Sequence, residues 1–295
     1  MKSVKNKNRF NFAALFFAII LTVYCLSLIL SFYWAIISSF KTTAEFMKTT
    51  FEFPKKFQWQ NYQKVMKNLF VPPDAGMGRM GNTYMPMLIL NSVLYALGTS
   101  LVGSFVPCIC GYAIQRFPTH LSKFVNVLVV VTMIIPIVGS QASMLQILMA
   151  LNLYNNMFGM YAMTFSFCSM YTLIYIGMFK GMSNTYSEAA KIDGAGPFLI
   201  FFKLYFPMSV GTFFTVTLLL FIAKWNDYYT PLLYMPKYPT LAFAIKSLDD
   251  NTATGLNMPN MKLAGCMFLF MPILVLFALF HKRLMVNVSV GGVKE

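Results

Sequence analysis

The chain has 295 residues, of which 58% are hydrophobic and only 11% are charged. A soluble domain carries about a quarter charged residues, so this composition excludes an ordinary soluble protein and predicts an integral membrane protein. The net charge of +14 would suggest nucleic acid in a soluble protein. Here the basic residues flank apolar stretches, where they anchor helices at lipid head groups, and we expect no nucleic-acid partner.

The first predicted element follows a basic start that contains Lys2, Lys5, Lys7 and Arg9. The next 30 residues, 11–40, carry no charge. This run is too long for the apolar part of a signal peptide and shows no clear cleavage site, so it predicts a retained first membrane span.

Further uncharged runs along the chain predict five more spans. A helix needs about 20 apolar residues to cross a hydrocarbon core of roughly 30 Å. The window 124–179 has no Asp, Glu, Lys or Arg and should hold two spans, separated by the asparagine cluster at 151–156. The predicted spans are residues 12–37, 87–113, 125–149, 158–179, 207–223 and 263–280. The predicted fold class is therefore all-α, a single polytopic transmembrane domain over 1–295 with six membrane helices.

The distribution of Lys and Arg predicts the orientation. With the N-terminus inside, the inner segments hold 12 of these residues and the outer segments hold 11. The count is nearly even, but the basic start before the first span favours cytoplasmic N- and C-termini. The outer loop 38–86, which contains seven Lys and Arg, conflicts with the rule. On this topology the loop 180–206 is the longest cytoplasmic loop.

That inner loop contains an unusual polar segment, TYSEAAKIDGAGPF, at 185–198. Thr185 and Glu188 fit a capping box, Gly194 fits a helix C-terminus, and Pro197 fits the first turn of a second helix. The segment is therefore predicted to fold as helix, turn, helix. Two interpretations remain open on local chemistry: a docking helix for a protein partner, or a connector that lies on the membrane.

The same segment resembles the signature of ABC-importer permease subunits, which is Glu-Ala-Ala, three residues, Gly, nine residues and Ile-x-Leu-Pro. The sequence has Glu188-Ala189-Ala190, then Gly194 at the same spacing, then Leu204-Tyr205-Phe206-Pro207. Leu204 and Phe206 depart from the pattern conservatively. The form EAAKIDGAG is similar to that of the carbohydrate-uptake branch.

Other segments extend this resemblance over most of the chain. WQNYQKVM at 59–66, LILNSVLYALGTS at 88–100 and WNDYYTPLLY at 225–234 resemble segments of that branch, with Asp227 where Glu is common. The ending GGVKE resembles its Gly-Gly-Val-Lys tail, with Glu295 where Gly is common. The six-span layout is similar to the smaller, maltose-type subunit.

The resemblance implies a cytoplasmic coupling helix that docks on a separate ATPase. It assigns ATPase coupling to Glu188, Ala189, Ala190, Asp193, Gly194 and Pro207. It also implies that the C-terminal tail reaches the ATPases through Gly291, Gly292 and Lys294. The implied partners are a second permease subunit in a heterodimer, two ABC ATPases and an extracytoplasmic sugar-binding protein, in the lipid of a prokaryotic plasma membrane.

No catalytic, cofactor or metal site is expected in this chain. It has no G-x-x-x-x-G-K-[ST] phosphate loop, so ATP would be bound only by the partner ATPases. The five cysteines lie in apolar runs without C-x-x-C spacing, which indicates buried thiols. The chain is therefore predicted not to be an enzyme.

Polar residues within the predicted spans are candidates for the substrate pathway, because such groups usually face a bundle interior or water. The candidates are Asn91, Ser140, Gln141, Ser143 and Gln146. The competing explanation is that these side chains join helices to one another by hydrogen bonds. The alternative function is an ATP-independent secondary transporter or channel, but no acidic residue lies in a predicted span and no internal repeat is visible.

Overall fold

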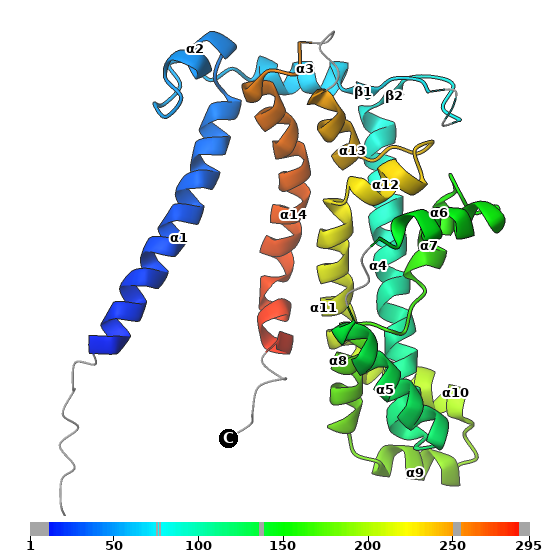
Figure 1. Ribbon diagram of the computed structural model, residues 1–295. Helices are drawn as coiled ribbons and strands as arrows, with labels where there is room; N and C mark the ends of the chain where they lie inside the picture. The colour runs from blue at the N-terminus through cyan, green and yellow to red at the C-terminus, as the bar shows by residue number, and fades with distance from the viewer. Residues whose placement is uncertain (1–11, 75, 77, 136–138, 250–254, 289–295) are drawn as a thin grey trace, which may run out of the picture.

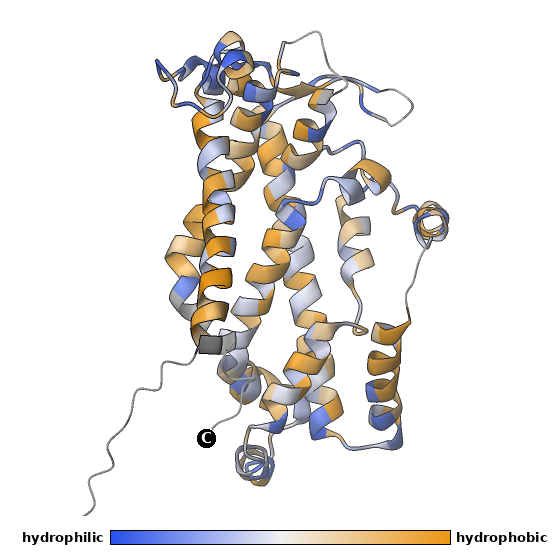
Figure 2. Cartoon of the chain, turned by 60° about the vertical axis from the view of Figure 1, so that its left-hand side comes forward, coloured by the Kyte–Doolittle hydropathy of each residue, from blue (hydrophilic) through white to orange (hydrophobic). Residues whose placement is uncertain are grey.

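The protein is a helical bundle with short helices at both ends (Figure 1). The computed structural model describes residues 12–288, apart from 75, 77, 136–138 and 250–254. Four long helical segments in the described part are apolar enough to cross a membrane, at Ala14–Ser39, Met85–Arg116, Pro197–Trp225 and Pro259–His281. Figure 2 shows mostly hydrophobic residues along the helices and hydrophilic residues gathered toward the two ends, as a membrane requires.

The long helices organise the bundle. They are α1 (Phe12–Ser39), α4 (Met85–Arg116), α11 (Phe206–Trp225) and α14 (Pro259–Val288). Helix α4 is central and packs against α11 and α8 (Met170–Lys180), whereas α14 lies between α1 and α11. Figure 1 shows α1 near α14 at one end of the bundle and diverging from it toward the N-terminus. Residues 14–33 of α1 are exposed, residues 34–36 are half-buried, and Ile37 is buried.

The contact between α4 and α8 depends on a small residue. A Cβ at Gly111 would lie 2.7 Å from Cβ of Tyr175 and 3.1 Å from the backbone nitrogen of Ile176. Only a glycine allows the two backbones to approach this closely, as is common between membrane helices. Beside it, Ser104 Oγ lies 2.7 Å from the hydroxyl of Tyr175 and joins the same two helices.

The structure interrupts two of the predicted spans. Residues 125–149 fall in α5 (His120–Ile134) and α6 (Gln141–Ala150), and residues 158–179 fall in α7 (Met157–Thr164) and α8. Near the first interruption Gly139 adopts a φ of +81°. At the second interruption, Thr172 Oγ1 donates to the carbonyl of Phe167, so a side-chain hydroxyl takes the place of a backbone N–H as the partner of that carbonyl. The turn predicted at the asparagine cluster is present, and Asn152 and Asn155 have φ values of 56° and 57°.

One end of the bundle, called here the α3 end, carries small elements. These are α2 (Thr43–Lys48), α3 (Gln60–Asn68), α12 (Tyr229–Tyr234), α13 (Leu241–Lys246), the 3-10 turn Ser247–Asp249 and an antiparallel pair, β1 (Phe70–Val71) and β2 (Thr83–Tyr84), with Phe70 opposite Tyr84. A buried apolar cluster that includes Leu88, Ala244 and Ala264 packs α13 between α4 and α14.

The opposite end, called here the α9 end, carries α9 (Thr185–Ile192) and α10 (Pro197–Ile200), followed by a π-helical turn at Phe201–Tyr205 that leads into α11. A second buried cluster, with Tyr112, Phe179, Phe201 and Tyr205, holds this end together. The two ends therefore have separate cores, which α4 and α11 connect.

Candidate functional site

The first candidate site is the α9 segment, which forms one tip of the molecule (Figure 1). The predicted helix, turn, helix is present: α9 ends at Ile192, Gly194 has a φ of +79°, and Pro197 is the first residue of α10. Gly194 N donates to the carbonyl of Lys191 at 3.0 Å, and Ala195 N donates to Ala190 at 2.9 Å. This pair of bonds is the Schellman motif, which needs the left-handed conformation that glycine adopts without strain.

The predicted capping box is wrong. Helix α9 takes Asn184 as its N-cap, without a side-chain capping bond, so Thr185 is its first helical residue. Glu188 is then one position too far along to reach back to the N-cap backbone. Its carboxylate is instead exposed in the first turn.

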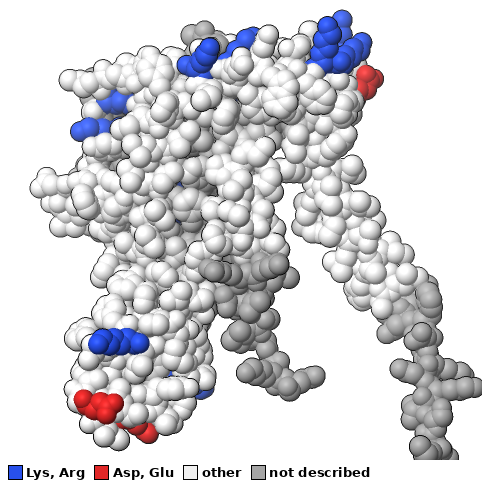
Figure 3. Space-filling model, turned by 180° about the vertical axis from the view of Figure 1, so that it is seen from behind, with Lys and Arg blue, Asp and Glu red and all other residues white. Residues whose placement is uncertain are grey.

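The side chains of α9 and its turn face outward. Glu188, Ala189, Asp193 and Gly194 are exposed, whereas Ala190 and Ala195 are half-buried against the aromatic cluster. Ile192 is 86% exposed. Figure 3 shows acidic side chains gathered at this end of the molecule. The tip thus presents small residues, two carboxylates and an exposed apolar side chain, a combination suited to a protein partner. Pro207, at the start of α11, is exposed but lies beyond the tip.

Sequence reasoning missed Arg116, the residue that holds the base of this tip. Its Nη2 donates to the carbonyls of Phe179 at 2.9 Å and Met182 at 2.8 Å, and its Nη1 donates to Oδ1 of Asn184. Its guanidinium lies 4.5 Å from the ring centroid of Tyr205. One side chain at the end of α4 therefore binds the end of α8, the N-cap of α9 and the turn before α11. In the sequence it looks like an ordinary basic residue at the end of a span.

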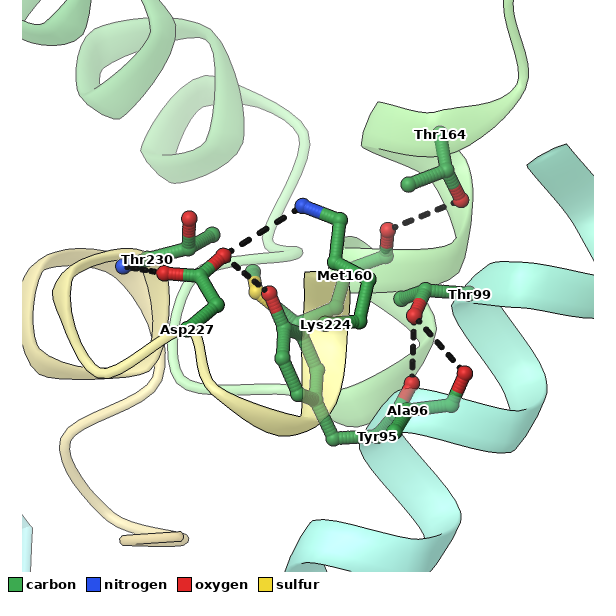
Figure 4. Close-up of polar contacts among 8 residues, drawn as sticks. All are labelled: Tyr95, Ala96, Thr99, Met160, Thr164, Lys224, Asp227 and Thr230. Atoms are coloured by element: carbon green, nitrogen blue, oxygen red, sulfur yellow. Dashed lines mark hydrogen bonds and ion pairs between the residues drawn. The ribbon is translucent and has the colours of Figure 1, made fainter. Parts of the chain in front are cut away.

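A second polar cluster lies deeper in the bundle, toward the α3 end (Figure 4). Oδ2 of Asp227 accepts from the hydroxyl of Tyr95 at 2.9 Å and lies 3.3 Å from Nζ of Lys224, while Oδ1 accepts from the backbone of Thr230 at 3.0 Å. Burial alone would raise the pKa of the Asp227 carboxyl, but the bonds from Thr230 and the charge of Lys224 outweigh it and hold that pKa below its usual value. The carboxylate therefore joins α4, α11 and α12.

We expect Asp227→Ala to lower the free energy of unfolding by about 2 kcal/mol, because it leaves Lys224 and the hydroxyl of Tyr95 without their shared partner. Asp227→Asn should cost less, since an amide oxygen still accepts a hydrogen bond. Thermal unfolding of the purified chain in detergent measures both variants. The matched control is Asn226→Ala, which removes an exposed neighbour. Equal shifts for Asn226→Ala and Asp227→Ala would contradict the role of the cluster.

The structure does not gather the five substrate-pathway candidates into one site. Asn91 is buried, and its amide donates to the carbonyl of Pro239 at 3.0 Å, which fits the helix-joining explanation. It also borders a pocket at the α3 end with Asn82, Lys237 and Tyr238. The other four side chains are exposed on or beside α6: Ser140, Gln141, Ser143 and Gln146. The tail residues Gly291, Gly292 and Lys294 lie outside the described residues.

The comparisons with known proteins agree on one kind of protein. A family model described as "binding-protein-dependent transport system inner membrane component" matches residues 103–288. The probable starch degradation products transport system permease protein AmyC of Thermoanaerobacterium thermosulfurigenes is 24% identical, over 90% of this chain and 91% of that protein. The diacetylchitobiose uptake system permease protein NgcG of Streptomyces coelicolor is 22% identical, over 95% and 88%.

A third relative is the melibiose/raffinose/stachyose import permease protein MelC of Bacillus subtilis, 24% identical over 89% of this chain and 90% of that protein. Among solved structures, a chain from a bacterial ABC transporter involved in the import of the acidic polysaccharide alginate matches with a TM-score of 0.73 and 19% identity. The match covers 96% of this chain and 99% of that chain. At this identity the match establishes the fold.

Proposed function

The chain belongs to the family of binding-protein-dependent transport system inner membrane components, a family of transport permeases rather than enzymes, and from this premise we propose that it is a permease subunit of an ATP-driven importer for a carbohydrate. We further propose an oligosaccharide as substrate. The names of three relatives, which refer to starch products, diacetylchitobiose and melibiose, raffinose or stachyose, support this substrate class.

The observation that carries the proposed mechanism is the exposed, capped helix α9 at one tip of the bundle. In this proposal α9 docks on a separate ATPase, with Glu188 and Asp193 meeting basic side chains and the small surface of Ala189 and Gly194 allowing close approach. Movement of the ATPases then tilts α4 and α11, which begin or end at this tip and run to the opposite end. The tail, with Gly291, Gly292 and Lys294, would reach the same ATPases.

The proposed topology has six crossings, with both termini and α9 in the cytoplasm. Helix α5 has 15 residues and extends about 22 Å, which is too short to cross alone. We therefore assign the third crossing to α5 with α6 and the fourth to α7 with α8. Non-helical backbone within a membrane is tolerated where protein or water covers it. A second, different permease subunit facing these interrupted helices would provide such cover. The exposed polar side chains of α6 would then face the shared pathway.

Reconstitution tests the proposal directly. The chain is placed in liposomes with a second permease, two ATPases and a sugar-binding protein taken from its neighbouring genes. We expect oligosaccharide uptake that requires both ATP and the binding protein, and no uptake with a non-hydrolysable ATP analogue. Uptake by the chain alone along a sugar or ion gradient would instead support the alternative, an ATP-independent secondary transporter or channel.

A further inference from the structure

An unusual surface lies at the outer end of α1, formed by residues 43–59 and called here the collar. It contains α2 and the segment that follows it. Four aromatic side chains of the collar are exposed although they are large and apolar: Phe51, Phe53, Phe57 and Trp59, with Phe51 86% exposed and Trp59 64% exposed. Exposed apolar groups in a contiguous patch indicate a binding surface.

The collar is fixed firmly to α1. Lys41 has a fully buried side chain whose Nζ donates to the carbonyls of Thr49 at 2.7 Å and Thr50 at 3.0 Å. Trp34 of α1 donates from Nε1 to the same Thr50 carbonyl at 3.0 Å. The ring of Phe40 lies 4.8 Å from that of Trp59. The exposed aromatics are therefore held in place at the level where α1 leaves its long apolar stretch.

Three lysines accompany these aromatics, with Lys55 and Lys56 between Phe53 and Phe57, and one exposed carboxylate, that of Glu52, lies among them. Lys48, Lys55 and Lys56 are exposed, and in the described part of the chain none of their ammonium groups is recorded in an ion pair. The carboxylate of Glu45 already has a partner, because its Oε1 accepts a hydrogen bond from the backbone N–H of Lys55 at 2.7 Å. Figure 3 shows basic side chains gathered above α1 at this end of the molecule, with an acidic side chain beside them.

We propose that the collar binds anionic phospholipid head groups of the leaflet that surrounds the C-terminal end of α1. The collar follows directly on the long apolar stretch of α1, whose residues 14–33 are exposed in the described structure, so it lies at the level where the chain leaves the hydrocarbon core. Tryptophan and phenylalanine rings insert at the level of lipid head groups, and lysines beside them attract negative charge. The outer loop 38–86 is rich in lysine, although Lys and Arg usually favour the cytoplasmic side. Binding of anionic lipid gives the lysines of the collar a role on the outer side of the membrane. This inference does not depend on transport.

The test uses the full-length chain in lipid nanodiscs. Brominated phosphatidylglycerol should quench the tryptophan fluorescence, and Trp59→Phe should remove much of that quenching. The apparent affinity for phosphatidylglycerol over phosphatidylcholine is measured by native mass spectrometry. In Lys55→Gln/Lys56→Gln it should fall about 25-fold, because each surface lysine contributes roughly fivefold to binding of an anionic membrane.

The matched control is Lys64→Gln/Lys67→Gln, which removes the same charge from exposed positions of α3 outside the collar. This control should change the affinity less than about twofold. Equal losses in both variants, or quenching that Trp59→Phe does not alter, would overturn the proposal. So would protection of Trp59 from an aqueous quencher only when a soluble binding protein is added, which would assign the collar to a protein partner. Equal unfolding temperatures in phosphatidylcholine alone confirm that all variants fold.

Discussion

Replacement of Gly194 by leucine is expected to abolish ATP-driven uptake and to prevent co-purification of the ATPase, while the chain still inserts and folds. The position has a φ of +79°, where an ordinary side chain costs roughly 1–2 kcal/mol. No neighbouring atom of the described residues lies within 4 Å of a Cβ placed there, so the described structure has room for the side chain. The backbone strain and the leucine side chain therefore change the shape of the exposed tip, where the partner is proposed to bind.

Two controls separate these causes. Gly194→Asn keeps a residue that tolerates the left-handed conformation, so it isolates the effect of bulk from that of strain. Gly177→Leu makes the same chemical change in α8, at a helical glycine where a Cβ would also have no neighbouring atom of the described residues within 4 Å. Normal uptake and full recovery of the ATPase with Gly194→Leu would rule out the docking role of α9. Loss of expression with Gly177→Leu would show that replacing a glycine by leucine destabilises this bundle in general, not only at the α9 tip.

The local features of the α9 tip were predictable because they depend on residues close together in the chain. A glycine four residues after an Ala-Ala pair and a proline three residues later define where α9 ends and α10 begins. The start of α9 was not predictable to the residue, because Asn184 and Thr185 are both able to begin a helix. The structure begins it one residue earlier than the capping-box pattern indicated.

The bends within the predicted third and fourth spans were hidden for a different reason. A uniformly apolar run shows that residues avoid water, but it has no periodicity that marks where the helix axis turns. The bend beside Gly139 and the bond from Thr172 to Phe167 depend on a few small or hydroxyl residues. Such residues also occur within continuous membrane helices, where they pack against neighbours.

The two polar clusters depend on contacts between distant parts of the chain. Arg116 meets acceptors that are 63 and 66 residues away, and Tyr95 meets Asp227 over 132 residues. A single sequence indicates that an arginine ends a span, but it does not indicate which carbonyls come near it. The contacts of Arg116 therefore emerge only from the folded arrangement.

Replacement of Arg116 by alanine is expected to loosen the α9 tip and to reduce sugar transported per ATP hydrolysed at least tenfold. The variant loses two charge-assisted hydrogen bonds to backbone carbonyls, each contributing about 1.5–3 kcal/mol, and a cation–π contact of about 1–2 kcal/mol. A local loss of this size exceeds the roughly 1.4 kcal/mol that changes an equilibrium constant tenfold. Residues 180–195 should then exchange amide hydrogens faster than in the wild type.

The conservative variant and a nearby control make this result specific. Arg116→Lys keeps the charge but replaces a planar fork by a single ammonium, so it should restore coupling only in part. Lys123→Ala removes an exposed charge near the same end and should leave exchange and coupling unchanged. If Arg116→Ala speeds amide hydrogen exchange without lowering the sugar transported per ATP, Arg116 stabilises the base of α9 but does not transmit the movement of the ATPases to α4. If neither quantity changes, α4 and α9 are not joined through this side chain.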